Sequence, residues 1–361
     1  MRSSIIDIVK GISIIMIVNV HLLSGQFFSI GCTYHVIAFF FTAGIVQGMR
    51  KKWEDNTISS FIKDKLTRLG YPFLTLSVCY MLMHMILNCI RGETIVNEVI
   101  TGSIIKTLTL QGIGTLWFLP VLFFGELIFF SVKRKKINDH LILLTGFLAV
   151  LTSSYLNNRG FDLLQISCKS QCLFSSIKIL STILLSSLIA STIIYLGFHL
   201  HQKLPNMFSE DVIRTKKEWI YMILICIFSF VIDYYFIEFY HGDLHKLDIG
   251  DPFVYIICSL TGIAFVFSFS FIIKKLFKNI SRLLIYFGEN SLIIMTTHTE
   301  YYINSIVYVL ISYCLAFWNI SAVPKNISAI SIILIMIIEI GVIYIIKHTC
   351  LKYIYIPAPK R

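Results

Sequence analysis

Charged side chains are scarce in this sequence, and their scarcity excludes a soluble globular protein. Asp, Glu, Lys and Arg make up 14% of the 361 residues, whereas 56% are hydrophobic and the mean hydropathy is +0.78. A water-soluble fold needs more polar surface than this composition can supply. We therefore expect a membrane protein that crosses the bilayer several times.

The sequence also lacks the motifs of several large classes of protein. It contains no paired Cys-x-x-Cys metal motif, no Walker loop, no Rossmann glycine pattern, no internal repeat and no long soluble segment. The nine cysteines are scattered, mostly in apolar runs where a thiol behaves as a small hydrophobic group. Only Cys168 and Cys172, in a predicted outside loop, could form a disulfide. We expect one domain, residues 1–361, with no appended soluble domain and no tightly bound cofactor.

One group of side chains has the spacing of metal ligands but an unfavourable setting. His241, Asp243 and His245 fall between two apolar runs, in a region that the sequence predicts to be an irregular outside loop. Histidine and carboxylate side chains at this spacing resemble metal ligands, but polar side chains in an irregular outside loop are more often simply solvated. A solvated polar loop is therefore the favoured interpretation, and no metal site is expected.

Long apolar runs are abundant, and their number predicts the architecture. Ten are long enough to cross a bilayer as helices. They lie near residues 4–25, 33–50, 69–90, 113–132, 140–157, 177–198, 219–239, 253–273, 291–317 and 328–347. The ninth region is interrupted by Gly288-Glu289-Asn290-Ser291 and is either one broken helix or two short ones. The prediction is an all-α protein with about ten transmembrane helices.

Lys and Arg are distributed unevenly between the two sides of the predicted membrane. With both termini cytoplasmic, 23 of the 31 lie on inside segments and 7 on outside loops, and Lys10 lies within the first run. Cytoplasmic loops carry such an excess, which persists to the C-terminus only if the ninth region crosses once. This topology and anionic lipids account for the net charge of +11, so we expect no nucleic-acid partner. The first run is too long for a signal peptide and has no small-residue cleavage site.

Three polar side chains share one stripe of the first apolar run. Lys10 and His21 are eleven residues apart, about three helical turns, and Asp7 lies about 40° from His21 around the helix. A charge at the centre of a bilayer costs about 3 kcal/mol on insertion scales and usually faces a partner or a polar cavity. The stripe therefore indicates a functional site. The structural alternative is an Asp7–Lys10 ion pair that holds the helix in place.

A second histidine stands at the outer end of the next run. His35 precedes an aromatic segment, and a short connection joins the first two predicted helices. We therefore expect His21 and His35 to lie in the outer third of the membrane on adjacent helices and to share one chamber. A hydrogen-bonded anchor at the interface is the alternative for His35 alone.

Two cations lie close together on the predicted cytoplasmic side. Lys65 and Arg68 are three residues apart in a short amphipathic helix, which Pro72 is expected to help terminate. Neighbouring cations on one face can grip phosphate groups. By composition alone, binding of lipid headgroups is the favoured alternative.

These motifs together resemble those of the acyltransferase-3 family of membrane O-acyltransferases, including its fucose O-acetylase-like branch. Members usually begin with an aspartate and a basic-x10-His pattern in the first helix, which is similar to Asp7, Lys10 and His21. The family's second helix has a histidine ahead of three aromatic residues, which His35 resembles. Lys10 is a departure, because many members have arginine there and a point charge replaces a bidentate group.

The resemblance continues along the chain in the same order. Lys65-Leu66-Thr67-Arg68 resembles the family's basic-x-x-Arg element, and Trp117-Phe118-Leu119 resembles its fourth-helix motif. Gly288-Glu289-Asn290-Ser291-Leu292 followed by His298 is similar to its late Gly-x-x-Ser-Leu…His pattern. Each motif alone is weak, but together they are specific.

The resemblance implies a membrane enzyme of the bacterial cytoplasmic (inner) membrane. Members take an acyl group, usually acetyl, from cytoplasmic acyl-CoA and place it on a glycan hydroxyl at the outer side. The implied partners are acetyl-CoA as co-substrate, a saccharide acceptor such as O-antigen or exopolysaccharide, lipid-linked or not, and membrane lipids.

Within such a reaction each singled-out residue receives an expected role. His21 fits a general base that activates the sugar hydroxyl, and His35 fits positioning of the acceptor or stabilisation of the tetrahedral intermediate. The positive charge of Lys10 is of the kind that stabilises the oxyanion of the intermediate, but Lys10 lies about 16 Å from His21 along the helix. We therefore place Lys10, with Asp7, on the passage for the pantetheine arm.

Further residues are expected on the donor side. Lys65 and Arg68 would bind the anionic part of acyl-CoA. Trp117, Glu126 and His298 are candidates for lining the passage, although a packed core histidine describes His298 equally well.

A transporter or flippase for a lipid-linked saccharide is the competing hypothesis, because it would also use intramembrane charges. The sequence shows neither an inverted repeat nor helices broken at matched positions of two halves. A purely structural scaffold leaves the costly Lys10, His21 and His35 unexplained. Consumption of the thioester donor distinguishes the enzyme from the transporter.

Overall fold

The computed structural model describes residues 3–50, 57–90, 97–168, 170–208, 215–318 and 324–357. It is 83% helical, which confirms the all-α prediction. Seven of the described helical segments are long and apolar enough to cross a membrane. They are Ile58–Asn88, Gly114–Arg134, Asp139–Ser167, Gln171–Lys203, Lys216–Phe236, Pro252–Leu276 and Asn326–His348. The predicted count of ten is not confirmed, and both chain ends, residues 1–2 and 358–361, lie outside the described residues.

The chain divides into two compact units, each assembled from separate segments. The first unit comprises Met1–Val20, Phe28–Asn56 and Phe124–Ser291, and the second comprises His21–Phe27, Thr57–Phe123 and Leu292–Arg361. A boundary falls directly after Val20. Asp7 and Lys10 therefore belong to the first unit, whereas His21 belongs to the second.

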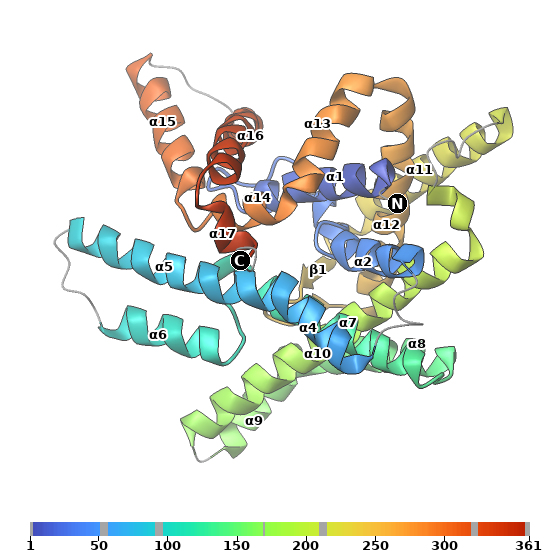
Figure 1. Ribbon diagram of the computed structural model, residues 1–361, viewed down its shortest axis with the longest axis horizontal. Helices are drawn as coiled ribbons and strands as arrows, with labels where there is room; N and C mark the ends of the chain where they lie inside the picture. Colours follow the sequence, from blue (N-terminus) through green and yellow to red (C-terminus); the bar gives the residue numbers. More distant parts are fainter. Residues whose placement is uncertain are drawn as a thin grey trace. The chain divides into compact units, whose positions relative to one another are not determined.

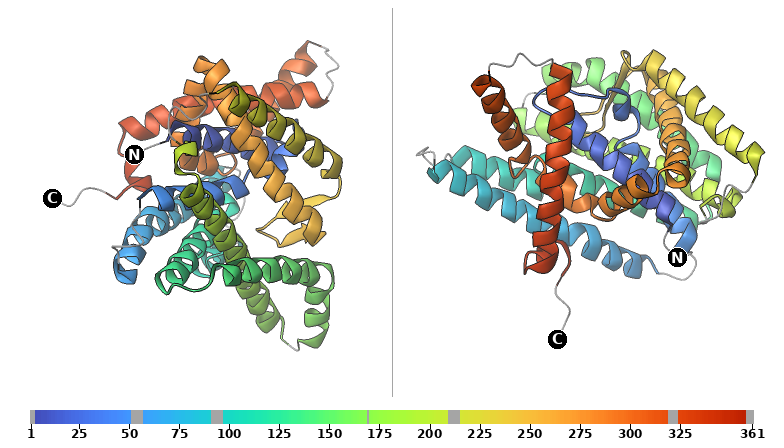
Figure 2. Two further views of the ribbon diagram at one scale, coloured as in Figure 1. Left: turned by 90° about the vertical axis from the view of Figure 1, so that its right-hand side faces the viewer. Right: turned by 90° about the horizontal axis from the view of Figure 1, so that it is seen from above.

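Long helices form most of the first unit (Figure 1). Helix α2 contacts α10, α1 contacts α13, α8 contacts α10, and α11 lies along α12, as Figure 2 also shows. The elements are α1 (Ser4–Val20), η1 (Ile30–Thr33), α2 (Ile37–Arg50), most of α7 (Phe118–Arg134), α8 (Asp139–Tyr155), a π turn η4 (Leu156–Gly160), α9 (Phe161–Ser167), α10 (Gln171–Lys203), η5 (Pro205–Phe208), α11 (Lys216–Phe236), α12 (Pro252–Leu276) and α13 (Lys278–Glu289).

Glycines let α1 and α13 approach until their backbones touch. A Cβ on Gly11 would collide with the carbonyl of Leu284, and one on Gly288 would collide with the carbonyl of Asp7. Without water to expel, helices in a bilayer associate through such close packing of small residues. The Asp7 end of α1 is therefore fixed to α13.

Helices α2 and α10 repeat this arrangement with a reciprocal pair. Gly44 of α2 lies against the carbonyl of Ile194, and Gly197 of α10 lies against the carbonyl of Phe41. Close packing at both glycines fixes the position of α2 against α10.

A buried carboxylate joins three elements of the first unit. Asp233 of α11 has 0% exposure and accepts hydrogen bonds from Thr33 of η1 at 3.2 Å and from Thr261 of α12 at 2.5 Å. Two donors offset the loss of hydration that burial imposes on the carboxyl group. Asp233 was not among the residues predicted from the sequence to be functional.

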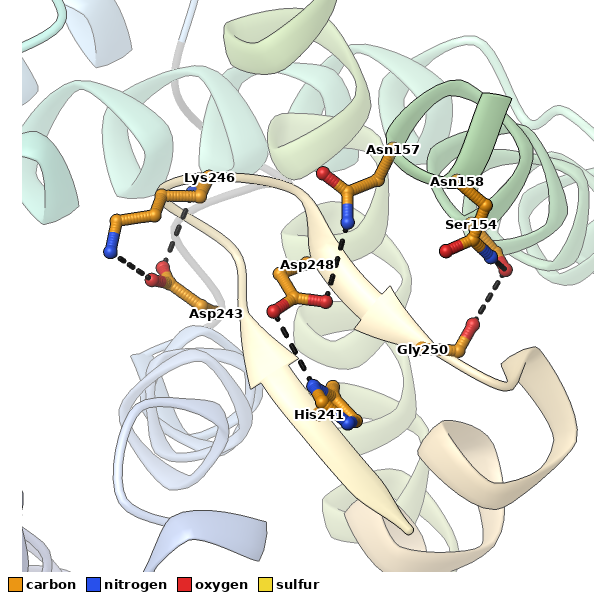
Figure 3. Close-up of polar contacts among 8 residues, drawn as sticks. All are labelled: Ser154, Asn157, Asn158, His241, Asp243, Lys246, Asp248 and Gly250. Carbon is orange, nitrogen blue, oxygen red and sulfur yellow. Dashed lines mark hydrogen bonds and ion pairs between the residues drawn. The ribbon is translucent and has the colours of Figure 1, made fainter. Parts of the chain in front are cut away.

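The two strands of the first unit form a short antiparallel hairpin, β1 (Tyr240–Asp243) and β2 (Asp248–Gly250). Figure 3 shows it beside the end of α8, where Asn157 donates to Asp248 and Ser154 donates to the carbonyl of Gly250. The predicted irregular loop is therefore wrong, because backbone pairing and these contacts order the segment. In the predicted topology the hairpin falls outside the membrane, and Ser154 and Asn157 lie at the outer end of the predicted run 140–157.

The hairpin side chains pair with one another rather than converging on one point. His241 lies 3.4 Å from Asp248, and Lys246 lies 3.6 Å from Asp243 (Figure 3). The described part of the chain holds no group of three or more His, Cys, Asp or Glu side chains suited to a metal ion. Cys168 and Cys172 are both free thiols.

The second unit contains the remaining helices. They are α4 (Ile58–Lys65), a π turn η2 (Leu66–Gly70), α5 (Tyr71–Ile90), α6 (Asn97–Leu108), η3 (Gly114–Trp117), the first turn of α7, α14 (Ser291–Thr297), α15 (Ile303–Phe317), α16 (Pro324–His348) and α17 (Lys352–Tyr355). Helix α15 contacts α16, and α17 contacts α5.

Pro72 does not end the helix that carries Lys65 and Arg68, so that prediction is wrong. Residues 58–90 are continuously helical, and the amide of Tyr71 bonds the Leu66 carbonyl in the wide π turn. Proline lacks an amide hydrogen and clashes with the preceding turn of a regular α-helix. A π turn directly before it changes the local hydrogen-bond register, so the chain remains helical.

The interrupted ninth region is a series of short helices. Helix α13 ends at Glu289, α14 spans seven residues, and a turn at 298–302 leads into α15. Tyr302 adopts a left-handed conformation, with φ of 60°, directly before α15. The region is therefore broken twice, and the second break places His298 at the end of α14.

Candidate functional site

His21 occupies the end of the first helix rather than its interior. Helix α1 ends at Val20, five residues before the end of the predicted apolar run, and the imidazole of His21 is exposed. The side-chain amide of Asn304 donates to the His21 carbonyl at 3.1 Å. Carbonyls at a helix C-terminus need such partners, because no later turn supplies them. Asn304 therefore fixes the backbone of His21.

His298 contacts the imidazole of His21 directly. Its Nε2 lies 3.2 Å from Nδ1 of His21, and the two ring centroids are 5.2 Å apart. His298 has 0% exposure, and its Nδ1 lies 2.7 Å from the carbonyl oxygen of Ile294. The exposed imidazole of His21 thus contacts the buried imidazole of His298. The sequence alone left His298 as a passage residue or a packed core residue and did not predict this contact.

Side chains from two other elements hold the end of α14. The hydroxyl of Thr115 in η3 donates to the Met295 carbonyl at 2.9 Å, and that of Tyr80 in α5 donates to the Thr296 carbonyl at 2.5 Å. Both donors bond carbonyls in the last turn of α14, where intrahelical partners run out. The position of His298 is therefore fixed from several directions.

A buried carboxylate lies next to the end of α14. Glu339 of α16 has 0% exposure, and the hydroxyl of Thr297 lies 2.8 Å from each of its carboxyl oxygens. Thr297 directly precedes His298, so α16 also contributes to the placement of the turn. Glu339 stands in a strongly apolar run, where a carboxyl group is a sequence signal of a functional site. It was nevertheless not among the residues predicted from the sequence.

Asp7 and Lys10 line a cavity within the first unit. Its volume is about 300 Å³, and it is lined by Ser3, Ile6, Asp7 and Lys10 of α1 and by Val46, Met49 and Arg50 of α2. This volume is at the lower end for small-molecule sites. Arg50, the last residue of α2, was not among the site residues predicted from the sequence. A helix N-terminus and two cations make the cavity suited to an anionic group.

His35 belongs to the first unit, in the turn that leads into α2. Its Nδ1 lies 2.9 Å from the carbonyl oxygen of Cys32, and its side chain is half-buried. A carbonyl can only accept, so Nδ1 carries the hydrogen and Nε2 can accept one. The chamber shared with His21 remains a prediction.

Lys65 and Arg68 lie at the end of α4 and in the following π turn. Nε of Arg68 lies 2.9 Å from Oδ1 of Asp64, and the Arg68 side chain is 50% exposed. Nζ of Lys65 lies 5.5 Å from the ring centroid of Phe61. Asp64 cancels part of the positive charge of the pair, which weakens the predicted phosphate clamp without removing it.

The two other predicted passage residues differ in their surroundings. Trp117 ends η3, is half-buried, and packs edge-on against Phe118 with ring centroids 6.4 Å apart. Glu126 of α7 is buried, with 4% exposure, and its Oε1 accepts a hydrogen bond from Gln47 of α2 at 3.1 Å. Gln47 precedes the cavity residue Arg50 by one helical turn. The passage roles themselves remain predictions.

One comparison with known proteins identifies a family. The sequence profile described as the acyltransferase domain matches residues 4–348, which includes every candidate residue named above. Neither the curated proteins nor the solved structures yield a match to the chain.

Proposed function

The chain belongs to the acyltransferase-3 family, and from this premise we propose that it is a membrane O-acetyltransferase of the fucose O-acetylase-like branch. It takes the acyl group from cytoplasmic acetyl-CoA and places it on a hydroxyl of a cell-surface or lipid-linked saccharide. The proposed location is the bacterial cytoplasmic membrane.

The His21 imidazole is the observation that supports this proposal. A sugar hydroxyl is a poor nucleophile at neutral pH and needs a base within hydrogen-bond distance. His21 is exposed at the end of α1, its carbonyl is bound by Asn304, and its ring rests on the buried His298. A base that is both accessible and held in one position meets this requirement.

The proposed reaction balances with His21 as the only proton carrier. Its imidazole takes the proton of the acceptor hydroxyl as the oxygen attacks the thioester carbonyl carbon. A carbon–oxygen bond forms, and the tetrahedral intermediate collapses with cleavage of the carbon–sulfur bond. The leaving thiolate of coenzyme A then receives the proton from His21, which restores the neutral base. His35 is the proposed group that positions the acceptor or stabilises the oxyanion.

The donor's anionic groups have two proposed contacts. The cavity between α1 and α2 offers Lys10 and Arg50. The end of α4 and the π turn after it offer half-buried Lys65 and exposed Arg68. Coenzyme A carries a diphosphate and a further phosphate, so more than one basic site fits its chemistry. Asp7 limits the net positive charge of the cavity.

The deciding experiment measures acetyl transfer by purified protein in lipid vesicles supplied with acetyl-CoA and the host's surface glycan. We expect His21→Ala to abolish transfer while the protein stays folded and inserted. His348→Ala is the matched control, because His348 is an exposed histidine in the last turn of α16. Transfer by His21→Ala near the wild-type rate would reject the general-base role.

The transporter alternative is tested in the same vesicles. An acyltransferase consumes the thioester in step with acylation of the glycan, whereas a flippase moves the glycan without consuming any donor. Mass spectrometry of the surface glycan with and without the gene identifies both the acyl group and the acceptor.

A further inference from the structure

The hydrogen bonds around His298 define which of its nitrogens carries hydrogen. Nδ1 lies 2.7 Å from the carbonyl oxygen of Ile294, and a carbonyl oxygen can only accept. Nδ1 of His298 must therefore be the donor. His298 is fully buried, where an imidazolium would lose the hydration that stabilises its charge. A neutral imidazole with hydrogen on Nδ1 has an acceptor at Nε2.

The same reasoning extends from His298 to His21. Nε2 of His298 lies 3.2 Å from Nδ1 of His21, and an acceptor at this distance requires a donor. Nδ1 of His21 therefore carries the hydrogen. In a neutral His21 the other ring nitrogen, Nε2, then holds the lone pair and is the atom able to take a proton.

We propose that His298 is a positioning residue that selects the tautomer of His21, so that Nε2 of His21 is the atom that removes the proton from the acceptor hydroxyl. The inference rests on the proposed function for its catalytic meaning. Its structural content, the hydrogen on Nδ1 of His21, does not depend on that function. The chain of bonds runs from His21 through His298 to the Ile294 carbonyl.

This arrangement follows the logic of a base oriented by a third group, with one chemical difference. In a catalytic triad an aspartate holds the histidine and stabilises its charged form. Here the holding group is a neutral imidazole. It fixes the ring and its tautomer, and when Nε2 of His21 gains a proton, the Nδ1–H bond to His298 becomes charge-assisted and stronger.

The rest of the unit maintains this geometry. Thr115 and Tyr80 bond the carbonyls of the two residues that follow Ile294, and Asn304 bonds the backbone of His21. Both imidazoles are therefore held at their backbones as well as at their rings. A side chain held in this way loses little freedom on reaching the reactive geometry.

Two substitutions at His298 separate hydrogen bonding from packing. In His298→Gln the side-chain carbonyl can accept from Nδ1 of His21, whereas His298→Leu offers no acceptor. We expect kcat to fall about 100-fold in His298→Leu and by less than about tenfold in His298→Gln, with the KM for acetyl-CoA unchanged. Equal losses in both variants would overturn the inference, as would no loss in either. Thermal unfolding confirms that the compared variants are folded.

A direct measurement reads the tautomer without any enzymatic activity. The protein has ten histidines, and a ¹⁵N-histidine spectrum in lipid nanodiscs, assigned by the signals lost in His21→Ala, distinguishes hydrogen on Nδ1 from hydrogen on Nε2. We expect Nδ1–H in the wild type and in His298→Gln, and exchange between both tautomers in His298→Leu. Nε2–H or a doubly protonated His21 in the wild type would refute the inference.

The control substitution is His348→Gln. Nδ1 of His348 lies 2.8 Å from the carbonyl oxygen of Tyr344, four residues earlier, and Nδ1 of His298 makes the same kind of contact with Ile294. Unlike His298, His348 has an exposed side chain. It should leave both kcat and the His21 signals unchanged. The spectrum also separates the two proposals. Acetyl transfer by the His21→Ala variant would reject the general-base role of His21 whatever its tautomer. Hydrogen on Nε2 of His21 in the wild type would reject only the role of His298.

Discussion

Neutralising Arg50 should weaken binding of the acyl donor, and the cavity predicts by how much. A sphere with the cavity's volume of about 300 Å³ has a radius of about 4 Å, so an enclosed phosphate would lie roughly 4–6 Å from the lining cations. At about 5 Å two unit charges interact with about 1 kcal/mol in water and about 3 kcal/mol at an effective dielectric constant of 20.

Arg50 is exposed, so its contribution lies near the aqueous limit. About 1 kcal/mol corresponds to a roughly fivefold higher KM for acetyl-CoA in Arg50→Gln, with kcat at saturating donor unchanged. Lys10 is half-buried and lies in the same cavity, so Lys10→Gln should raise the KM further. Both effects should shrink in high salt, which screens exposed charges.

The assay is acetyl transfer at varied acetyl-CoA concentration and fixed glycan, repeated at two salt concentrations. Arg134→Gln is the matched control, because Arg134 is an exposed arginine at the end of a helix, α7, and does not line the cavity. An unchanged KM in Arg50→Gln, or an equal rise in Arg134→Gln, would show that the cavity does not hold the donor's phosphates.

Two further predictions test the second basic site and the helix packing. Replacing half-buried Lys65 and exposed Arg68 together by Gln should raise the KM for acetyl-CoA about fivefold, as expected for charges near the surface. An unchanged KM would assign both residues to lipid headgroups. Gly44→Ala should destabilise the protein by about 1–3 kcal/mol, because its Cβ meets the Ile194 carbonyl, and thermal unfolding measures the loss. Gly341→Ala, in a helix with nothing within 4 Å of the added Cβ, should be neutral or stabilising, and an equal loss there would contradict the packing argument.

Hydropathy predicted a helical membrane protein because the bilayer demands long apolar segments and internally satisfied backbones. Its count of ten spans is not confirmed, since seven of the described helices are long and apolar enough to cross. Predictions failed where local geometry has more than one solution. Pro72 favours a helix end, but a π turn keeps the chain helical. The region around His241 looked irregular because two short strands carry too little periodic signal, and only their pairing orders them.

The residues of the candidate site also divide into those that the sequence identified and those that it did not. Asp7, Lys10 and His21 were recognisable because charges and titratable groups are costly in an apolar run. Glu339 carried the same signal and was overlooked. In the sequence, Arg50 is one of several basic residues on a predicted cytoplasmic segment. Nothing around it in the sequence indicates that it lines a cavity with Lys10.

By itself, the sequence determined that this is a helical membrane protein of the acyltransferase-3 family, because composition, apolar length and ordered motifs are local properties of the chain. Only the tertiary structure decided that His21 rests on His298, a residue 277 positions away. No periodicity encodes such a contact, since it depends on where α1 ends and on the turn after α14. Under the proposed function, the direction of the hydrogen bonds through that contact assigns Nε2 of His21 as the nitrogen that takes the proton.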